Sequence, residues 1–172
     1  LLQPVEGSAQ LISPGKLSSP HGDLEGIRNC TKCHQLRRSG TAPERCLACH
    51  EPLARRIERD EGLHGRMADR SCDACHKEHF GVGFELVQLD SLDFEHGERV
   101  GYALLGEHRS ATCRACHQPD LVTDPAVVAA KTAPGALART FLGLPTDCTS
   151  CHESKSPHDG EFEGQACTDC HD

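Results

Sequence analysis

The chain has 172 residues, a formal net charge of −8, 37% hydrophobic residues and 3% aromatic residues, with no tryptophan. This length allows one ordinary domain or two small ones, but the chain is too poor in large apolar side chains for a conventional hydrophobic core. The acidic balance argues against nucleic-acid binding and favours basic or cationic partners. No apolar run approaches the length of a membrane span.

The chain divides by composition into an N-terminal arm and one domain. Residues 1–20 are rich in Pro, Ser and Gly without helical or strand periodicity, so we expect an extended arm. Residues 21–172 predict mostly irregular coil with a few short α-helices and little strand. Helices are expected at 51–60, where Pro52 suits the first turn, and at 125–131. Partial alternation at 84–89 predicts a short strand or hairpin arm.

Six copies of the motif Cys-x-x-Cys-His use all 12 cysteines. This motif is the attachment signature of c-type haem: the cysteines form thioethers with the haem vinyl groups, and the histidine binds the iron as proximal ligand. Two close pairs lie at 30–50 and 148–171, with central motifs at 72–76 and 113–117. Numbered in chain order, motifs 1 to 6 are Cys30, Cys33 and His34; Cys46, Cys49 and His50; Cys72, Cys75 and His76; Cys113, Cys116 and His117; Cys148, Cys151 and His152; and Cys167, Cys170 and His171.

Zinc binding and disulfide formation are the alternative uses of such cysteine pairs. Neither needs a histidine directly after the second cysteine, and six such placements by chance are far less probable than a haem signature. We therefore predict six covalently bound haems c. The porphyrins would supply the hydrophobic core that the chain lacks, so folding should depend on haem insertion.

The six histidines outside the motifs equal the predicted haems in number. Several precede a motif closely: His108 lies five residues before Cys113, and His64 eight before Cys72. We predict that they are distal iron ligands, which gives bis-histidine haems of low potential and leaves Met67 without a ligand role. The sequence does not assign them to individual haems. The predicted distal ligands are His21, His64, His79, His96, His108 and His158.

The two ends of the chain share a local pattern. Ser19-Pro20-His21 precedes Cys30, and Ser156-Pro157-His158 precedes Cys167, with nine residues from histidine to cysteine in both cases. Coincidence among common turn residues is one explanation. The functional interpretation is that each end presents one haem and one ligand histidine in the same local way.

Two further stretches make the chain similar to the low-potential multihaem c-type cytochromes, in particular the class III-like group. Phe94-Glu95-His96, followed by Gly106-Glu107-His108 and Cys113, resembles the Phe-x-His…Gly-x-His…CxxCH pattern of that group. Residues 75–79, Cys-His-Lys-Glu-His, resemble its CxxCHxxH variant. The resemblance implies little regular secondary structure, closely packed haems and rapid electron transfer between them. Six motifs rather than four mean that the haem order of the four-haem fold cannot be copied.

We therefore expect an electron-transfer protein rather than an enzyme, located in the periplasm or outside the cell. Its setting is a periplasmic carrier, a subunit of a membrane redox complex, or an extracellular cytochrome filament. Its partners would be other redox proteins or copies of itself, and in a filament His21 or His158 would ligate a haem of the next subunit. No signal peptide is visible at the start of the chain, which we expect to follow its cleavage.

The contrasting hypothesis is a multihaem reductase or oxidase. Such an enzyme needs one haem with an open axial position and nearby acid–base or cationic groups. Tyr102, Arg109 and Arg114 are the candidates for these groups. The equal numbers of motifs and additional histidines argue against an open position.

Overall fold

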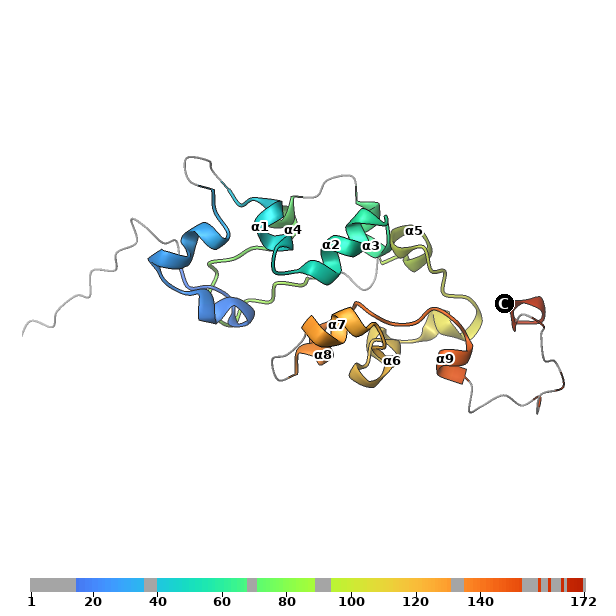
Figure 1. Ribbon diagram of the computed structural model, residues 1–172. Coiled ribbons are helices and arrows are strands. Elements are labelled where there is room, and N and C mark those ends of the chain that lie inside the picture. Colours follow the sequence, from blue (N-terminus) through green and yellow to red (C-terminus); the bar gives the residue numbers. More distant parts are fainter. Residues whose placement is uncertain are drawn as a thin grey trace, which may run out of the picture. The chain divides into compact units, whose positions relative to one another are not determined.

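The computed structural model describes residues 15–35, 40–67, 71–88, 94–130, 135–152, 158, 161, 165 and 167–171. Figure 1 shows short helices joined by coil. Within the described residues, β pairing is limited to an isolated bridge between His34 and Thr41, and no helix is long and apolar enough to cross a membrane. The predicted class of short helices with little strand is confirmed.

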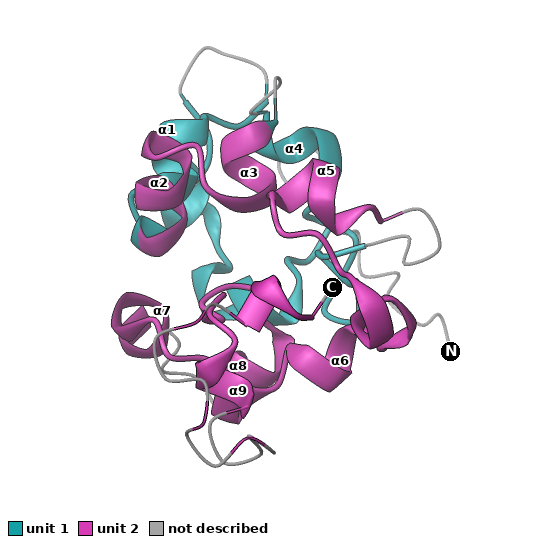
Figure 2. Cartoon of the chain, turned by 90° about the vertical axis from the view of Figure 1, so that its right-hand side faces the viewer, with its two compact units in different colours: residues 1–51, 67–90 teal, residues 52–66, 91–172 magenta. Residues whose placement is uncertain are grey.

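The chain forms two compact units, coloured separately in Figure 2. Unit 1 comprises Leu1–Glu51 and Met67–Asp90, and unit 2 comprises Pro52–Arg66 and Ser91–Asp172. Motifs 1 to 3 belong to unit 1 and motifs 4 to 6 to unit 2. The division into an arm of residues 1–20 and one domain of residues 21–172 stays a prediction, and residues 1–14 lie outside the described part.

The described part of unit 1 contains short helices, and two of them have a proline in the first turn. Pro20 occupies the first turn of η1 and Pro43 that of α1, where proline's missing N–H costs no hydrogen bond. The last residues of the predicted arm are tied down: Gly81 N–H donates to Lys16 O at 2.9 Å, and Ser19 N–H to Val82 O at 3.2 Å. The elements are η1 (Ser19–Leu24), η2 (Ile27–Lys32), α1 (Pro43–Leu47) and α4 (Cys72–Cys75).

The strand expected at 84–89 is absent over its described part, 84–88. The reason lies in the use of a backbone group: Leu86 O accepts a hydrogen bond from His76 Nδ1 at 2.7 Å. This carbonyl therefore positions a motif histidine instead of pairing with a neighbouring strand.

Unit 2 contains both helices that the sequence predicts. The helix expected at 51–60 is α2 (Glu51–Glu58), most of which lies in unit 2, and the one expected at 125–131 is α7 (Pro125–Ala130). In addition, α3 (Gly62–Arg66) packs against α5 (His96–Val100). The residue after α5, Gly101, caps this helix in the left-handed region with φ 79°. The other elements are η3 (Gly106–Ser110), α6 (Cys113–Cys116), η4 (Pro119–Leu121), α8 (Ala136–Arg139), α9 (Thr149–His152) and η6 (Cys167–Asp169).

Asp124 links α7 to α2. Its Oδ1 accepts hydrogen bonds from the N–H groups of Ala126 and Val127, at 2.9 and 3.3 Å, which caps the start of α7. Its Oδ2 lies 3.1 Å from the guanidinium of Arg56 in α2. Val127, whose N–H it binds, is fully buried, so this cap also fixes one of the few buried apolar side chains.

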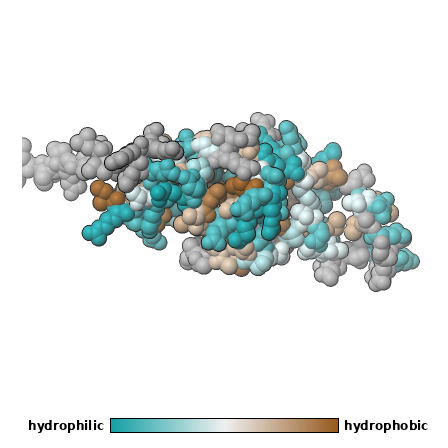
Figure 3. All heavy atoms as spheres, turned by 45° about the horizontal axis from the view of Figure 1, so that its top comes forward, coloured by the Kyte–Doolittle hydropathy of each residue, from teal (hydrophilic) through white to brown (hydrophobic). Residues whose placement is uncertain are grey.

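The described residues bury very little apolar surface. The buried hydrophobic side chains are Ala42, Val122 and Val127. Larger ones stay exposed, with Ile27 at 69% and Phe80 at 67%, and Figure 3 shows such apolar groups among hydrophilic ones on the visible face. A protein core of this size is too small to stabilise 172 residues by itself, which fits a fold built around a bound apolar group.

Candidate haem-binding sites

All six motifs fold into the same backbone turn. In each, the histidine N–H donates to the carbonyl oxygen of the first cysteine, with N···O distances of 2.8–3.0 Å. Residues i, i+3 and i+4 of a helical turn project from one face. Both thiols and the imidazole of a motif therefore lie on one face, as attachment to a single flat haem requires. All 12 cysteines are free thiols rather than disulfides.

Motifs 5 and 6 differ from the others in how far the chain shields their cysteines. In motifs 1 to 4 one cysteine of each is half-buried, whereas Cys148, Cys151, Cys167 and Cys170 are all exposed. The backbone turn is nevertheless formed, because Cys151 N–H donates to Cys148 O at 3.2 Å and Cys170 N–H donates to Cys167 O at 3.3 Å. Thioether attachment at all 12 cysteines stays a prediction from the sequence, and the described residues give the four cysteines of motifs 5 and 6 little cover.

Among the described residues, five motif histidines each lie opposite a histidine from outside the motifs. The ring centroids of these pairs are 6.0–6.3 Å apart. Each pair combines one predicted proximal with one predicted distal ligand. We number the sites by their motifs: site 1 is His34 with His79, site 2 is His50 with His21, site 4 is His117 with His96, site 5 is His152 with His108, and site 6 is His171 with His158.

This spacing suits an iron ion between two imidazoles. A metal bound at about 2 Å by one nitrogen of each ring holds the ring centres about 6 Å apart. The residues present therefore fit haem c with two histidine ligands. The role of these histidines as iron ligands stays a prediction from the sequence, and the same holds for His76 of motif 3, in unit 1, and for His64, in unit 2.

The two ends of the chain do not place their histidines in the same way. His158 lies with His171, the histidine of the motif that follows it. His21 passes over the neighbouring motif and lies with His50. The ring of His21 also contacts Glu78, 57 residues later. Ser156 and Pro157 of the repeated pattern lie outside the described residues.

Backbone carbonyls fix the orientation of several of these rings. An imidazole whose Nδ1–H donates to a carbonyl presents Nε2 to a metal. Such bonds join His34 Nδ1 to Gly40 O at 3.0 Å, His79 Nδ1 to Gly15 O at 3.0 Å, and His76 Nδ1 to Leu86 O at 2.7 Å.

The contact between His79 and Gly15 requires a glycine. His79 adopts φ 70°, an unusual conformation for a residue with a side chain. A Cβ on Gly15 would lie 2.3 Å from the carbonyl oxygen of His79. Gly15 therefore lets the backbone approach closely enough to hold the His79 ring.

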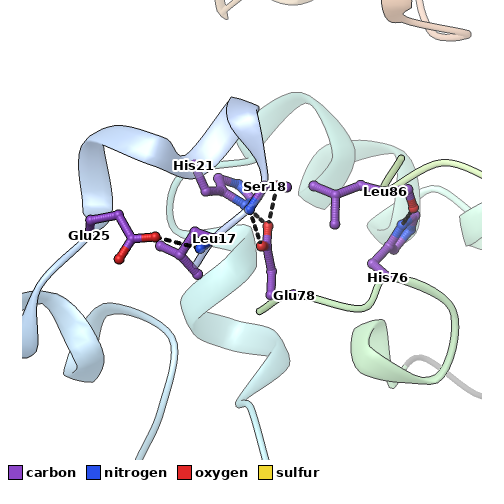
Figure 4. A network of polar contacts seen from close by, with 7 residues as sticks. All are labelled: Leu17, Ser18, His21, Glu25, His76, Glu78 and Leu86. Atoms are coloured by element: carbon purple, nitrogen blue, oxygen red, sulfur yellow. Dashed lines mark hydrogen bonds and ion pairs between the residues drawn. The ribbon is translucent and has the colours of Figure 1, made fainter. Parts of the chain in front are cut away.

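Site 2 has a carboxylate beside one of its rings (Figure 4). Glu78 Oε1 contacts His21 Nδ1 at 2.5 Å and accepts from Ser18 Oγ at 2.7 Å, while Oε2 accepts from Ser18 N–H at 2.8 Å. Burial opposes the charge of Glu78, but these hydrogen bonds outweigh it and hold the pKa of Glu78 below its ordinary value. Ser18 is only 1% exposed, so the network is built into unit 1.

Site 4 has a different environment. His117 Nδ1 is buried and has no hydrogen-bond partner among the described residues. Its ring meets the Phe141 ring edge-on at 5.0 Å, and the Arg114 guanidinium lies over Phe141 at 4.1 Å. Arg114 also donates to His117 O at 3.0 Å. Burial, followed by the charges of His96 and Arg114, lowers the pKa of His117.

Motifs 1 to 3 lie close together in unit 1, and motifs 4 and 5 lie close together in unit 2. Burial, the charge of Glu78 and the thiol of Cys49 raise the pKa of Cys33, which places motif 2 near motif 1. Burial and the adjacent Cys72 thiol raise the pKa of Cys46 to about 11, which places motif 3 near motif 2. In unit 2, burial and the thiols of motifs 5 and 4 raise the pKa of Tyr102.

Comparison with known proteins agrees with the histidine and cysteine pattern. Residues 11–83, which contain motifs 1 to 3, match the model of the class III cytochrome c family. This match covers less than half of the chain and supports a multihaem c-type cytochrome. The family binds haem c covalently and transfers electrons, and its members are typically extracytoplasmic. Neither a curated protein nor a solved structure matches the chain.

The candidate acid–base and cationic groups of an enzyme all lie in unit 2. Arg109 Nε donates to Leu104 O at 3.3 Å, Arg114 is bound beside His117, and Tyr102 is 42% exposed. Sequence reasoning missed the role of Ser18 and Glu78. The position of Glu78 between His76 and His79 was the available signal, because a side chain between two ligands is well placed to contact a third.

Proposed function

We propose that the cytochrome carries six haems c, one on each motif, and that two histidines bind each iron. The observation that supports this most strongly is the set of five histidine pairs with ring centroids 6.0–6.3 Å apart. Each contains one motif histidine, as one iron per motif requires. From these pairs we infer the distal ligand of five haems: His79 for motif 1, His21 for motif 2, His96 for motif 4, His108 for motif 5 and His158 for motif 6.

Electron transfer is the function that this coordination favours. Haem c supplies an iron that cycles between the ferrous and ferric states. Nδ1 contacts hold both rings of site 1 and the His21 ring of site 2 in place. Two imidazoles at each iron would close both axial positions against small substrates. The closeness of motifs 1, 2 and 3 in unit 1 suits passage of single electrons from one site to the next. A reductase or oxidase would need an open position instead.

We place the cytochrome outside the cytoplasm, as a carrier between redox proteins. His21 and His158 each have a motif histidine of the same chain as ring partner, which supports ligation within one chain rather than across a filament contact. The acidic charge of −8 suits a partner with a basic docking face.

The test is the haem content and size of the intact holoprotein. The pyridine haemochrome assay and the intact mass should both give six haems per chain, and sedimentation should give a monomer at low concentration. Five or fewer haems in fully matured protein would contradict the assignment. Filaments that dissolve when His21 or His158 is replaced would contradict ligation within one chain.

A further inference from the structure

In site 2, a formal negative charge contacts a ring nitrogen of a predicted ligand. In site 1, both Nδ1 atoms are bonded to neutral backbone carbonyls, from Gly40 and Gly15. In site 2, His21 Nδ1 faces the carboxylate of Glu78 at 2.5 Å. Hydrogen bonds from the backbone and hydroxyl of Ser18 keep that carboxylate in place.

Site 4 has the opposite charge nearby. The guanidinium of Arg114 lies over the Phe141 ring that meets His117, and it donates to the His117 carbonyl oxygen and to Thr140 O, both at 3.0 Å. These two hydrogen bonds hold the positive charge beside the site. His117 Nδ1 has no acceptor among the described residues that could offset it.

These charges act on a bound iron in opposite directions. A carboxylate that accepts the Nδ1 proton of a ligand histidine makes the ligand more basic and favours the ferric state. A fixed cation near the iron favours the ferrous state, because reduction removes one positive charge. Hydrogen bonds hold both charged groups in place, and water screens the half-buried Glu78 less than the exposed Arg114.

We propose that Glu78 and Arg114 separate the reduction potentials of two haems, so that the haem of site 2 has a lower potential than the haem of site 4. Both are positioning residues: Glu78 acts through the His21 ring, and Arg114 acts through its charge beside His117. The proposal rests on the proposed haem ligation. It gives the molecule an internal order of reduction, in which site 4 accepts an electron before site 2.

The first experiment replaces Glu78 by glutamine in the holoprotein. Glu78→Gln keeps an acceptor for His21 but removes the charge, so the reduction equilibrium of one haem should shift about tenfold toward the ferrous state, or about 59 mV for one electron. Spectroelectrochemical titration measures this shift, and the ferric EPR signal of the same haem should change. Glu25→Gln is the matched control, because Glu25 binds the backbone N–H of Leu17 in the same unit.

The second experiment replaces Arg114. Arg114→Gln should lower the potential of one other haem, and Arg114→Lys, which keeps the charge, should restore most of it. Arg139→Gln is the control, because Arg139 is another cation of the same unit. It lies at the end of α8, and its guanidinium is beside Gly135. Shifts of opposite sign at two different haems support the proposal.

Unchanged potentials in Glu78→Gln and Arg114→Gln, with haem content intact, would overturn it. If Glu78→Gln fails to take up haem, Ser18→Ala provides a second reading. This change removes one hydrogen-bond donor from the carboxylate oxygen that faces His21. The potential of the same haem should therefore fall below its wild-type value. An unchanged potential would overturn the role of Glu78. Fewer than six haems per chain in the wild-type protein would instead contradict the proposed function.

Discussion

His21 is the residue on which site 2 depends. Replacing it by alanine removes the ring opposite His50 and opens one axial position. We expect His21→Ala to bind carbon monoxide at one haem per chain in the reduced state, measured as a difference spectrum. Asp23→Ala, an exposed change in the same 3-10 helix η1, is the control and should bind none. Failure of His21→Ala to bind carbon monoxide would remove His21 from the ligand set.

Gly15 tests the close approach of the backbone to site 1. A methyl group there would overlap His79 O at 2.3 Å, so Gly15→Ala must displace the backbone that holds the His79 ring. We expect a loss of about 1–3 kcal/mol in the free energy of unfolding, measured by urea denaturation of the holoprotein. Gly22→Ala, with nothing within 4 Å of the added carbon, should change stability by far less. Equal effects of both variants would contradict the account.

At the level of elements, the sequence predicted what depends on neighbouring residues. The haem motifs, with their histidines at a fixed spacing, and the helices at α2 and α7 follow from local patterns. The expected strand at 84–89 was wrong over 84–88, because the carbonyl of Leu86 serves His76. Local periodicity carries no information about such a contact.

The pairing of histidines was beyond the sequence for the same reason. His79 is oriented by Gly15, 64 residues away, and His21 by Glu78, 57 residues away. Contacts over such separations depend on how the short turns pack, and one sequence supplies no signal for that. The count of six additional histidines predicted distal ligands without predicting their partners.

Asp124 should stabilise the junction of α2 and α7. Asp124→Asn removes the ion pair with Arg56 and should cost about 1 kcal/mol at pH 7. Hydrogen bonds from Val127, Ala126 and Arg56 outweigh burial and hold the pKa of Asp124 below its ordinary value. Its charged form therefore stabilises the fold above the unfolded pKa of about 4, and this contribution is lost as the pH falls through the lower folded pKa.

Urea unfolding at pH 7 and in increasingly acidic buffer measures this effect. The difference between wild type and Asp124→Asn should shrink as the pH falls through the folded pKa of Asp124. Asp120→Asn, an exposed neutralisation in the neighbouring 3-10 helix η4, is the control. A difference that is independent of pH would show that the ion pair does not contribute.

For the whole molecule, haem should replace the missing core. Among the described residues Ala42, Val122 and Val127 are the buried apolar side chains, while Ile27 and Phe80 remain exposed. We therefore expect the chain without attached haem to show no cooperative thermal transition by circular dichroism, whereas the holoprotein shows one. A cooperative transition of equal midpoint in both forms would contradict the dependence on haem.

The most direct test of the account is the coordination of every iron in the wild-type holoprotein. Five histidine pairs are present, and the six histidines outside the motifs equal the predicted haems in number. Both observations predict that every haem iron has two histidine ligands. Ferric EPR should show only low-spin signals, and carbon monoxide added to the reduced protein should leave its absorption spectrum unchanged. A high-spin ferric signal together with stoichiometric carbon monoxide binding at one haem would contradict the account and indicate an open, enzyme-like site.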